Sequence, residues 1–121
     1  MVEVECVDFV SVLTQDIRRA KKFYGETLGL PIETEGENDL EFTLGQVTLD
    51  VFNPASAGQE FAPSPAGIAI RVPDVAAARA ELEAKGVAFA GTDDSGVCHM
   101  AFFQDPDGNW VILHRRYEPY A

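Results

Sequence analysis

The sequence predicts an α+β fold made of two tandem βαβββ modules. The first observation is an internal repeat, in which residues 9–25 (FVSVLTQDIRRAKKFYG) match residues 67–83 (GIAIRVPDVAAARAELE) at an offset of 58 positions. Self-similarity at one fixed offset indicates a duplicated structural unit. The second observation is that each repeat starts with a strand pattern, continues at helical spacing and is followed by strand-like segments. Two similar modules in one chain therefore form the expected architecture.

The modules are expected to occupy about residues 7–53 and about residues 67–116 of a single domain over residues 1–121. A chain of this length buries enough surface for one domain. The stretch 54–66 has prolines and small residues without periodicity, which indicates a linker.

Each module is expected to open with a short strand and one helix. Asp16 and Asp74 are suitable N-caps, because a carboxylate accepts hydrogen bonds from the free amides of a first helical turn. Gly29 and Gly86 follow the helical patterns, where a left-handed residue commonly ends a helix. Three strands are expected after each helix, at residues 31–36, 39–45 and 46–53 in the first module and at 87–91, 97–104 and 109–115 in the second.

The composition argues against several classes of function. The net charge is −11, from 20 acidic and 9 basic residues. Such a field repels phosphate backbones, and no basic stripe with interleaved aromatics is present, so we expect no nucleic-acid partner. No segment approaches the roughly 20 apolar residues of a membrane span, and we expect no membrane partner. The N-terminus lacks a secretion signal, which favours a cytoplasmic location. Cys6 and Cys98 have no metal-ligand spacing and are expected to be free thiols.

In the last hairpin, successive side chains of each strand are expected to point to opposite faces of the sheet. A turn centred on Asp105–Gly108 predicts that Gln104 faces Asn109 and that His99 faces His114. Phe103, Trp110 and Ile112 would then share the cavity face with both histidines. The opposite, apolar face would lie under the helix and hold Cys98, Met100, Phe102, Val111 and Leu113.

The equivalent hairpin of the first module has a tight turn at Gly45–Gln46, which places Glu41 opposite Asp50. The apolar face toward the helix would hold Leu40, Phe42, Leu44, Val47, Leu49 and Val51. The cavity face would hold Glu41, Thr43, Thr48, Asp50 and Phe52. From the opening strands, Phe9, Ser11 and Leu13 and then Gly67, Ala69 and Arg71 would face the cavity.

The repeat, the stretch DIRRAKKFYGETLGL and the DPDGN turn together resemble the vicinal oxygen chelate superfamily of glyoxalase I, bleomycin-resistance proteins and extradiol dioxygenases. The resemblance covers nearly the whole chain. It implies two βαβββ modules whose curved sheets form an open barrel with a central ligand cavity, and it implies a homodimer.

In the metal-using relatives, ligands stand on both opening and both closing strands. By resemblance, these places fall on Phe9, Asp50, Gly67 and Ile112, of which only Asp50 can coordinate a metal. We therefore expect no family-type metal site and no cofactor. A substitute site built from His99, His114, Glu41 and Asp50 remains an alternative.

The leading hypothesis is a protein that binds a small organic ligand in an aromatic cavity without metal, as antibiotic-binding members of the family do. Arg71 would anchor an anion, or would pair internally with Asp50. The alternative is an enzyme of lyase, isomerase or dioxygenase type, with a rebuilt metal site or with acid–base chemistry at His99, His114 or Glu41. A third class is a structural domain whose own side chains fill the cavity. The expected ligand-binding residues are Phe9, Ser11, Asp50, Phe52, Arg71, Phe103, Trp110, Ile112 and His114.

Overall fold

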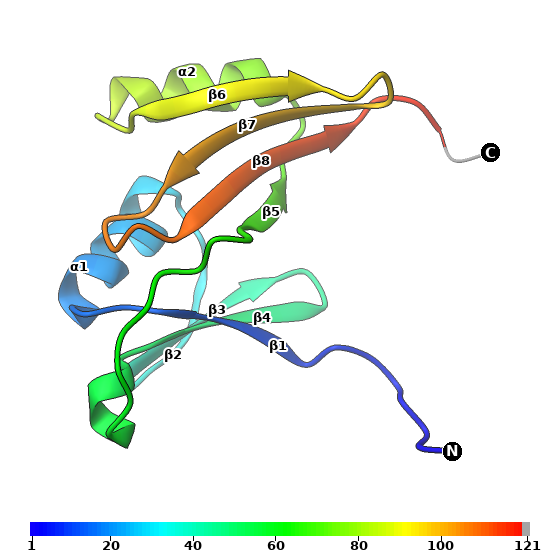
Figure 1. The fold of residues 1–121 in the computed structure, drawn as a ribbon. Helices are drawn as coiled ribbons and strands as arrows, with labels where there is room; N and C mark the ends of the chain where they lie inside the picture. Colours follow the sequence, from blue (N-terminus) through cyan, green and yellow to red (C-terminus); the bar gives the residue numbers. More distant parts are fainter. Residues whose placement is uncertain (120–121) are drawn as a thin grey trace. The chain divides into compact units, whose positions relative to one another are not determined.

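The computed structural model describes residues 1–119 and confirms an α+β fold with two repeated sheets (Figure 1). The chain divides into two compact units, Met1–Ala62 and Pro63–Ala121, which we call unit 1 and unit 2. Each unit contains one four-stranded sheet, and neither sheet closes on itself. The two sheets have equivalent strand orders, which confirms the tandem modules.

Unit 1 has the strand order β1-β4-β3-β2, with β1 parallel to β4 and the other pairs antiparallel. Its elements are β1 (Phe9–Leu13), α1 (Ile17–Lys21), the π-helix η1 (Lys22–Thr27), β2 (Ile32–Glu35), β3 (Asp39–Leu44), β4 (Val47–Phe52) and the 3₁₀-helix η2 (Pro54–Ala57).

Unit 2 has the order β5-β8-β7-β6, with β5 parallel to β8. Its elements are β5 (Ile68–Arg71), α2 (Val75–Ala84), β6 (Phe89–Asp94), β7 (Cys98–Gln104) and β8 (Trp110–Arg116). Helix α2 contacts β7 and β8, so it covers one face of this sheet (Figure 1).

The predicted helix caps are confirmed. The Asp16 carboxylate accepts a hydrogen bond from the Arg19 amide at 3.1 Å, and the Asp74 carboxylate accepts one from the Ala77 amide at 3.0 Å. Gly29 has φ +73° and ends the first helical segment in the left-handed region. Each cap satisfies a first-turn amide that has no partner within its own helix.

The spacing of the apolar residues suggested that the first helix is α-helical throughout, but only its first part is. After Lys21 it widens into η1, and the Leu28 amide donates to the Phe23 carbonyl five residues earlier at 2.9 Å. Phe23 and Tyr24 are both buried there and meet edge to face at 5.2 Å. We infer that the wider turn brings two adjacent aromatic side chains into one core.

The first hairpin has the predicted register. Glu41 lies opposite Asp50, and Leu40 lies opposite Val51. Four side chains on the helix-facing side have no exposed surface: Leu40, Phe42, Leu49 and Val51. The sheet of unit 1 therefore has a dry face against α1 and an open face on the other side.

The last hairpin is shifted by one residue from the prediction. Gln104 lies opposite Trp110, and Phe102 lies opposite Ile112. The loop is one residue longer than expected, because Asn109 belongs to it: the Asp105 amide donates to the Asn109 carbonyl at 2.8 Å. A shift of one residue exchanges the two faces of a strand, so the predicted faces of β7 are wrong and those of β8 are right.

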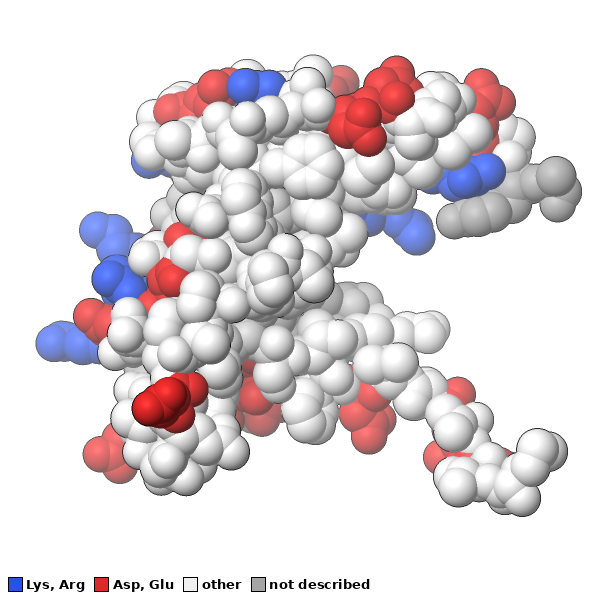
Figure 2. Space-filling view, viewed as in Figure 1, with Lys and Arg blue, Asp and Glu red and all other residues white. Residues whose placement is uncertain are grey.

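None of the helices within residues 1–119 has the length and apolarity that a membrane crossing requires. On the face shown in Figure 2, acidic side chains are found on both units, in keeping with the net charge of −11.

Candidate functional site

Most of the predicted binding residues of unit 2 lie on the open face of its sheet. On β8 the alternating residues Trp110, Ile112 and His114 point away from α2, because Val111 and Leu113 are buried on the helix side. The register adds Phe102 on β7, opposite Ile112, and Arg71 on β5, beside His114. These side chains form one continuous surface.

A hollow of about 330 Å³ lies on this face, which is within the size range of small-molecule pockets. Its apolar floor consists of Phe102, Trp110 and Ile112. The other lining residues are Pro65, Ala66, Ala90, Gly91 and Thr92. This apolar and aromatic lining favours an apolar or aromatic ligand.

One side of the hollow is the end of the linker, held by the last hairpin loop. Asn109 is fully buried, and its amide oxygen accepts from the Ser64 amide at 2.8 Å. Its amide nitrogen donates to the Asp105 carboxylate at 2.8 Å. The Trp110 amide donates to the Ser64 carbonyl at 3.2 Å. Asn109 thus fixes the linker beside Trp110, a role that the sequence prediction missed because it placed Asn109 in the strand.

Gly67 lies close to the same lining residues, and a larger side chain there would be in tight contact with them. A Cβ atom there would lie 3.2 Å from the Cβ atom of Trp110 and 3.4 Å from Cδ1 of Ile112. Gly67 also has φ +83°, which favours glycine. By resemblance this position is one of the family's metal-ligand places, and here Trp110 and Ile112 occupy the space beside it.

The other end of the open face is basic. A hollow of about 390 Å³ there is lined by Arg71, His114, Arg115, Arg116, Tyr117, Glu118 and Pro119. Arg71 forms no ion pair with an acidic side chain in the described part of unit 2. The Arg116 guanidinium donates to the Pro119 carbonyl at 3.4 Å. The face therefore changes from aromatic to cationic along β8.

The open face of unit 1 is polar at its centre. The Ser11 hydroxyl donates to the Asp50 carboxylate at 3.1 Å, and Glu41 lies opposite Asp50. Partial burial raises the pKa of Asp50 above its ordinary value. The Ser11 hydrogen bond opposes that shift, and the charges of Asp39 and Glu41 add to it. Phe9 and Phe52 also lie on this face, and Phe9 is 60% exposed.

Two of the predicted site residues lie elsewhere. Phe103 is not part of the cavity face: it is fully buried on the helix side, opposite Val111, and its ring is 5.0 Å from that of Phe89. His99 lies opposite Arg115, not His114, so the two histidines are not cross-strand neighbours and point to opposite faces. Both errors follow from the additional loop residue.

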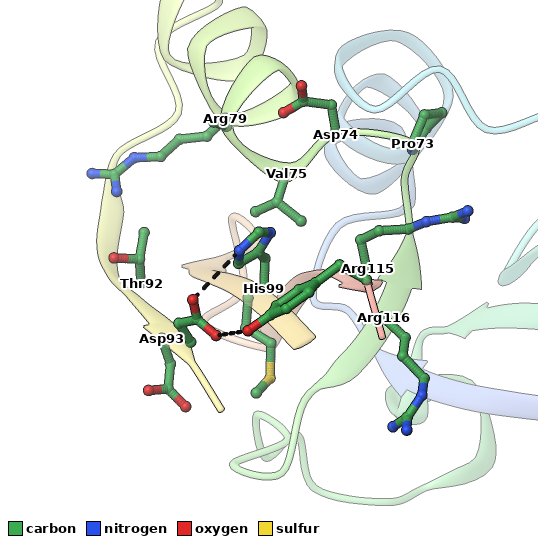
Figure 3. Close-up of a pocket in the computed structure, with 13 residues that line it drawn as sticks. Pro73, Asp74, Val75, Arg79, Thr92, Asp93, His99, Arg115 and Arg116 are labelled. Atoms are coloured by element: carbon green, nitrogen blue, oxygen red, sulfur yellow. Dashed lines mark hydrogen bonds and ion pairs between the residues drawn. The ribbon is translucent and has the colours of Figure 1, made fainter. Parts of the chain in front are cut away.

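His99 forms a cluster with Asp94 and Tyr117 beside α2 (Figure 3). Its Nε2 atom is 3.4 Å from the Asp94 carboxylate, and its ring centre is 4.4 Å from that of Tyr117. The Tyr117 hydroxyl donates to Asp94 at 2.7 Å, and this bond raises the pKa of Tyr117 to about 12. The Gly96 amide, then the Tyr117 hydroxyl and His99, lower the pKa of Asp94. The hollow around the cluster, of about 800 Å³, also includes Val75 and Arg79.

Within residues 1–119, no group of three or more His, Cys, Asp or Glu side chains has a geometry that could hold a metal ion. Cys6 and Cys98 are free thiols, as predicted.

The sequence profile of the Glyoxalase/Bleomycin resistance protein/Dioxygenase superfamily matches residues 7–113, which is most of the chain. The chain belongs to this superfamily. A search of curated proteins found no significant match.

Solved structures with a similar fold include both binding proteins and enzymes. TnmS3, an antibiotic-binding protein from Streptomyces sp. CB03234, is 27% identical with a TM-score of 0.79, over 96% of this chain and 99% of that one. A glyoxalase/bleomycin resistance protein from the same organism is 28% identical with a TM-score of 0.74, over 91% and 100%. Lactoylglutathione lyase from Agrobacterium tumefaciens is 17% identical with a TM-score of 0.81, over 93% and 94%. At 17% identity the last likeness concerns the fold alone.

Proposed function

We propose that this chain binds a small organic molecule and that the aromatic hollow of unit 2 is the main contact surface. The observation that carries the proposal is the apolar hollow formed by Phe102, Trp110 and Ile112, with cationic groups in a second hollow further along β8. Ligand pockets are usually of this kind, mostly apolar with a few placed polar groups. The proposed binding residues are Phe9, Ser11, Asp50 and Phe52 in unit 1 and Arg71, Trp110, Ile112 and His114 in unit 2. Phe102 replaces Phe103 in this set.

The binding proteins of the superfamily support this proposal. TnmS3, at 27% identity, is an antibiotic-binding protein. We infer that this chain has a function of the same general kind, with a ligand of its own. Acid–base catalysis at His114 or Glu41 remains the alternative, and turnover of a bound ligand would distinguish it from simple binding.

The chain has a single tryptophan, and Trp110 is in the hollow, so its fluorescence reports on this surface directly. The test is a screen of small aromatic and heteroaromatic compounds, read by Trp110 emission and by the melting temperature. A binder should change both, and Ile112→Ala should weaken it by ~10-fold. Val87→Ala, outside the lining residues, is the control and should leave affinity unchanged. If no compound changes either quantity, the proposal is wrong.

We also propose that binding needs no metal ion. Three of the four family ligand places are taken by Phe9, Gly67 and Ile112, none of which has a side-chain donor atom, and a Cβ atom at Gly67 would be in tight contact with Trp110. Titration of protein purified without chelator or tag with Zn²⁺, Mn²⁺, Fe²⁺ and Ni²⁺ should give no site of micromolar affinity. A site of one metal per chain, lost in His114→Ala, would instead support a rebuilt metalloenzyme.

We propose further that the protein is a cytoplasmic homodimer. Light scattering after gel filtration should give twice the 13.2 kDa mass of the chain. A mass of one chain at micromolar concentration would contradict the dimer.

A further inference from the structure

We propose that the ligand of the unit 2 hollow is an aromatic organic anion, with its ring on Ile112, beside Trp110, and its carboxylate at Arg71 and His114. This inference rests on the proposed function and specifies the class of ligand. It assigns the apolar and the cationic ends of one sheet face to two parts of one molecule.

The strand register places the two ends at a suitable separation. Ala69 lies beside Ile112, and Arg71 lies beside His114, two residues further along the same parallel pair. Two residues of a strand span about 7 Å. A carboxylate about 7 Å from an aromatic ring can therefore reach Arg71 while the ring covers Ile112, next to Trp110 on the open face.

The charges at the far end favour an anion. Among the described residues lining that hollow, Arg71, Arg115 and Arg116 are cationic, and Glu118 alone is acidic. Arg71 has no acidic partner in the described part of unit 2, whereas Arg79 on the helix side lies 3.4 Å from Glu83. A guanidinium group without a carboxylate partner can bind a ligand carboxylate through two parallel hydrogen bonds.

The net charge of the chain favours a ligand of the opposite charge to the one that we propose. At −11, the overall field attracts cations and repels anions. Selection by that field would favour a cationic ligand, whereas selection by Arg71 and His114 would favour an anionic one. The sign of the preferred ligand charge therefore tells the two mechanisms apart.

The experiment compares 4-phenylbutanoate, 4-phenylbutanamide and 4-phenylbutylammonium, which share one carbon skeleton and differ in charge. Each is titrated against the full-length chain, with Trp110 emission as the readout. The acid should bind at least ~10-fold more tightly than the amide, since hydrogen bonds to charged groups are stronger than those between neutral groups. Added salt should weaken binding of the acid and leave that of the neutral amide unchanged.

Variants then locate the anion. Arg71→Gln should reduce the affinity for the acid by ~10-fold and leave that for the amide unchanged, and His114→Gln should have a smaller effect of the same kind. Arg79→Gln removes the same charge from the helix side of the same sheet and should change neither affinity.

Three outcomes would overturn the inference: equal binding of acid and amide, preference for the ammonium compound, or no binding of the acid up to ~10 mM. If compounds of other charge still change Trp110 emission, the proposed function stands and only the anionic class is wrong. If Arg79→Gln weakens the acid as much as Arg71→Gln does, the effect belongs to the net charge, and the assignment to Arg71 fails.

Discussion

The two units have the same strand order, but their open faces are chemically reversed. At the centre of unit 1, Ser11 pairs with Asp50 on the parallel strands; at the equivalent place of unit 2, Ala69 pairs with Ile112. At the end of the same strand pair, unit 1 has Leu13 beside Phe52. Unit 2 has Arg71 beside His114 at that end. Unit 1 is thus polar at the centre and apolar at the end, and unit 2 is the opposite.

The helix-facing sides do not differ in this way. The register makes Phe42 of β3 equivalent to Phe103 of β7, and both are fully buried. Likewise, Leu49 corresponds to Val111, which is 1% exposed. Close packing against a helix limits what these positions tolerate. The open faces are under no such limit, so we infer that the reversal reflects what each face binds.

The strongest way to test the division into two faces is to truncate two adjacent phenylalanines. Phe103→Ala should lower the free energy of unfolding by about 3–5 kcal/mol, since it leaves a cavity in the core. Phe102→Ala, on the half-buried open face, should lower it by only about 1 kcal/mol and should weaken ligand binding instead. Chemical denaturation and Trp110 titration measure the two effects. Equal destabilisation by both variants would contradict the register of β7.

A second change gives unit 2 the central residue of unit 1. Ile112→Asp places an acid where Asp50 stands in the other sheet, and it should reduce ligand affinity by ~10-fold or more and stability by about 1–2 kcal/mol. Ile112→Leu keeps the apolar surface and is the control for shape. If Ile112→Asp binds the ligand normally, the apolar centre of this face is not what recognises it.

These two faces also show what sequence reasoning can and cannot predict. The two-residue turn at Gly45–Gln46 allows one simple register, and the faces of β3 and β4 were predicted correctly from it. The caps at Asp16 and Asp74 were also predictable, because capping depends on local chemistry.

The errors come from interactions that are not local. Asn109 leaves the strand because its side chain joins Asp105 to Ser64, 45 residues away, and no strand periodicity contains that information. The resulting shift moved Phe103 and His99 to the helix side. The contact of His99 with Tyr117 depends on the same shift, since it requires His99 to lie opposite Arg115. The candidate site was thus predictable on β8 and β5 but not on β7.

The smallest expected effect concerns the polar centre of unit 1. The pKa of Asp50 is raised, so the folded protein binds this proton more tightly than the unfolded chain does. The stability from this group is fully present below its unfolded pKa and is lost as the pH rises through the folded pKa. Asp50→Asn should therefore stabilise the protein at pH 7, by about 0.5 kcal/mol after screening by solvent, and the gain should fade below about pH 4.

Asp94→Asn is the matched control because its sign is opposite. The Gly96 amide and the Tyr117 hydroxyl lower the pKa of Asp94, so its stabilising contribution is present above the unfolded pKa and is lost as the pH falls through the folded one. This variant should lower the melting temperature at pH 7 and approach the parent protein in acid. Melting curves of both variants from pH 3 to 8 should diverge in opposite directions from the parent curve. If both shift the same way at pH 7, burial does not govern the ionisation of Asp50, and the polar centre of unit 1 is better solvated than its neighbours indicate.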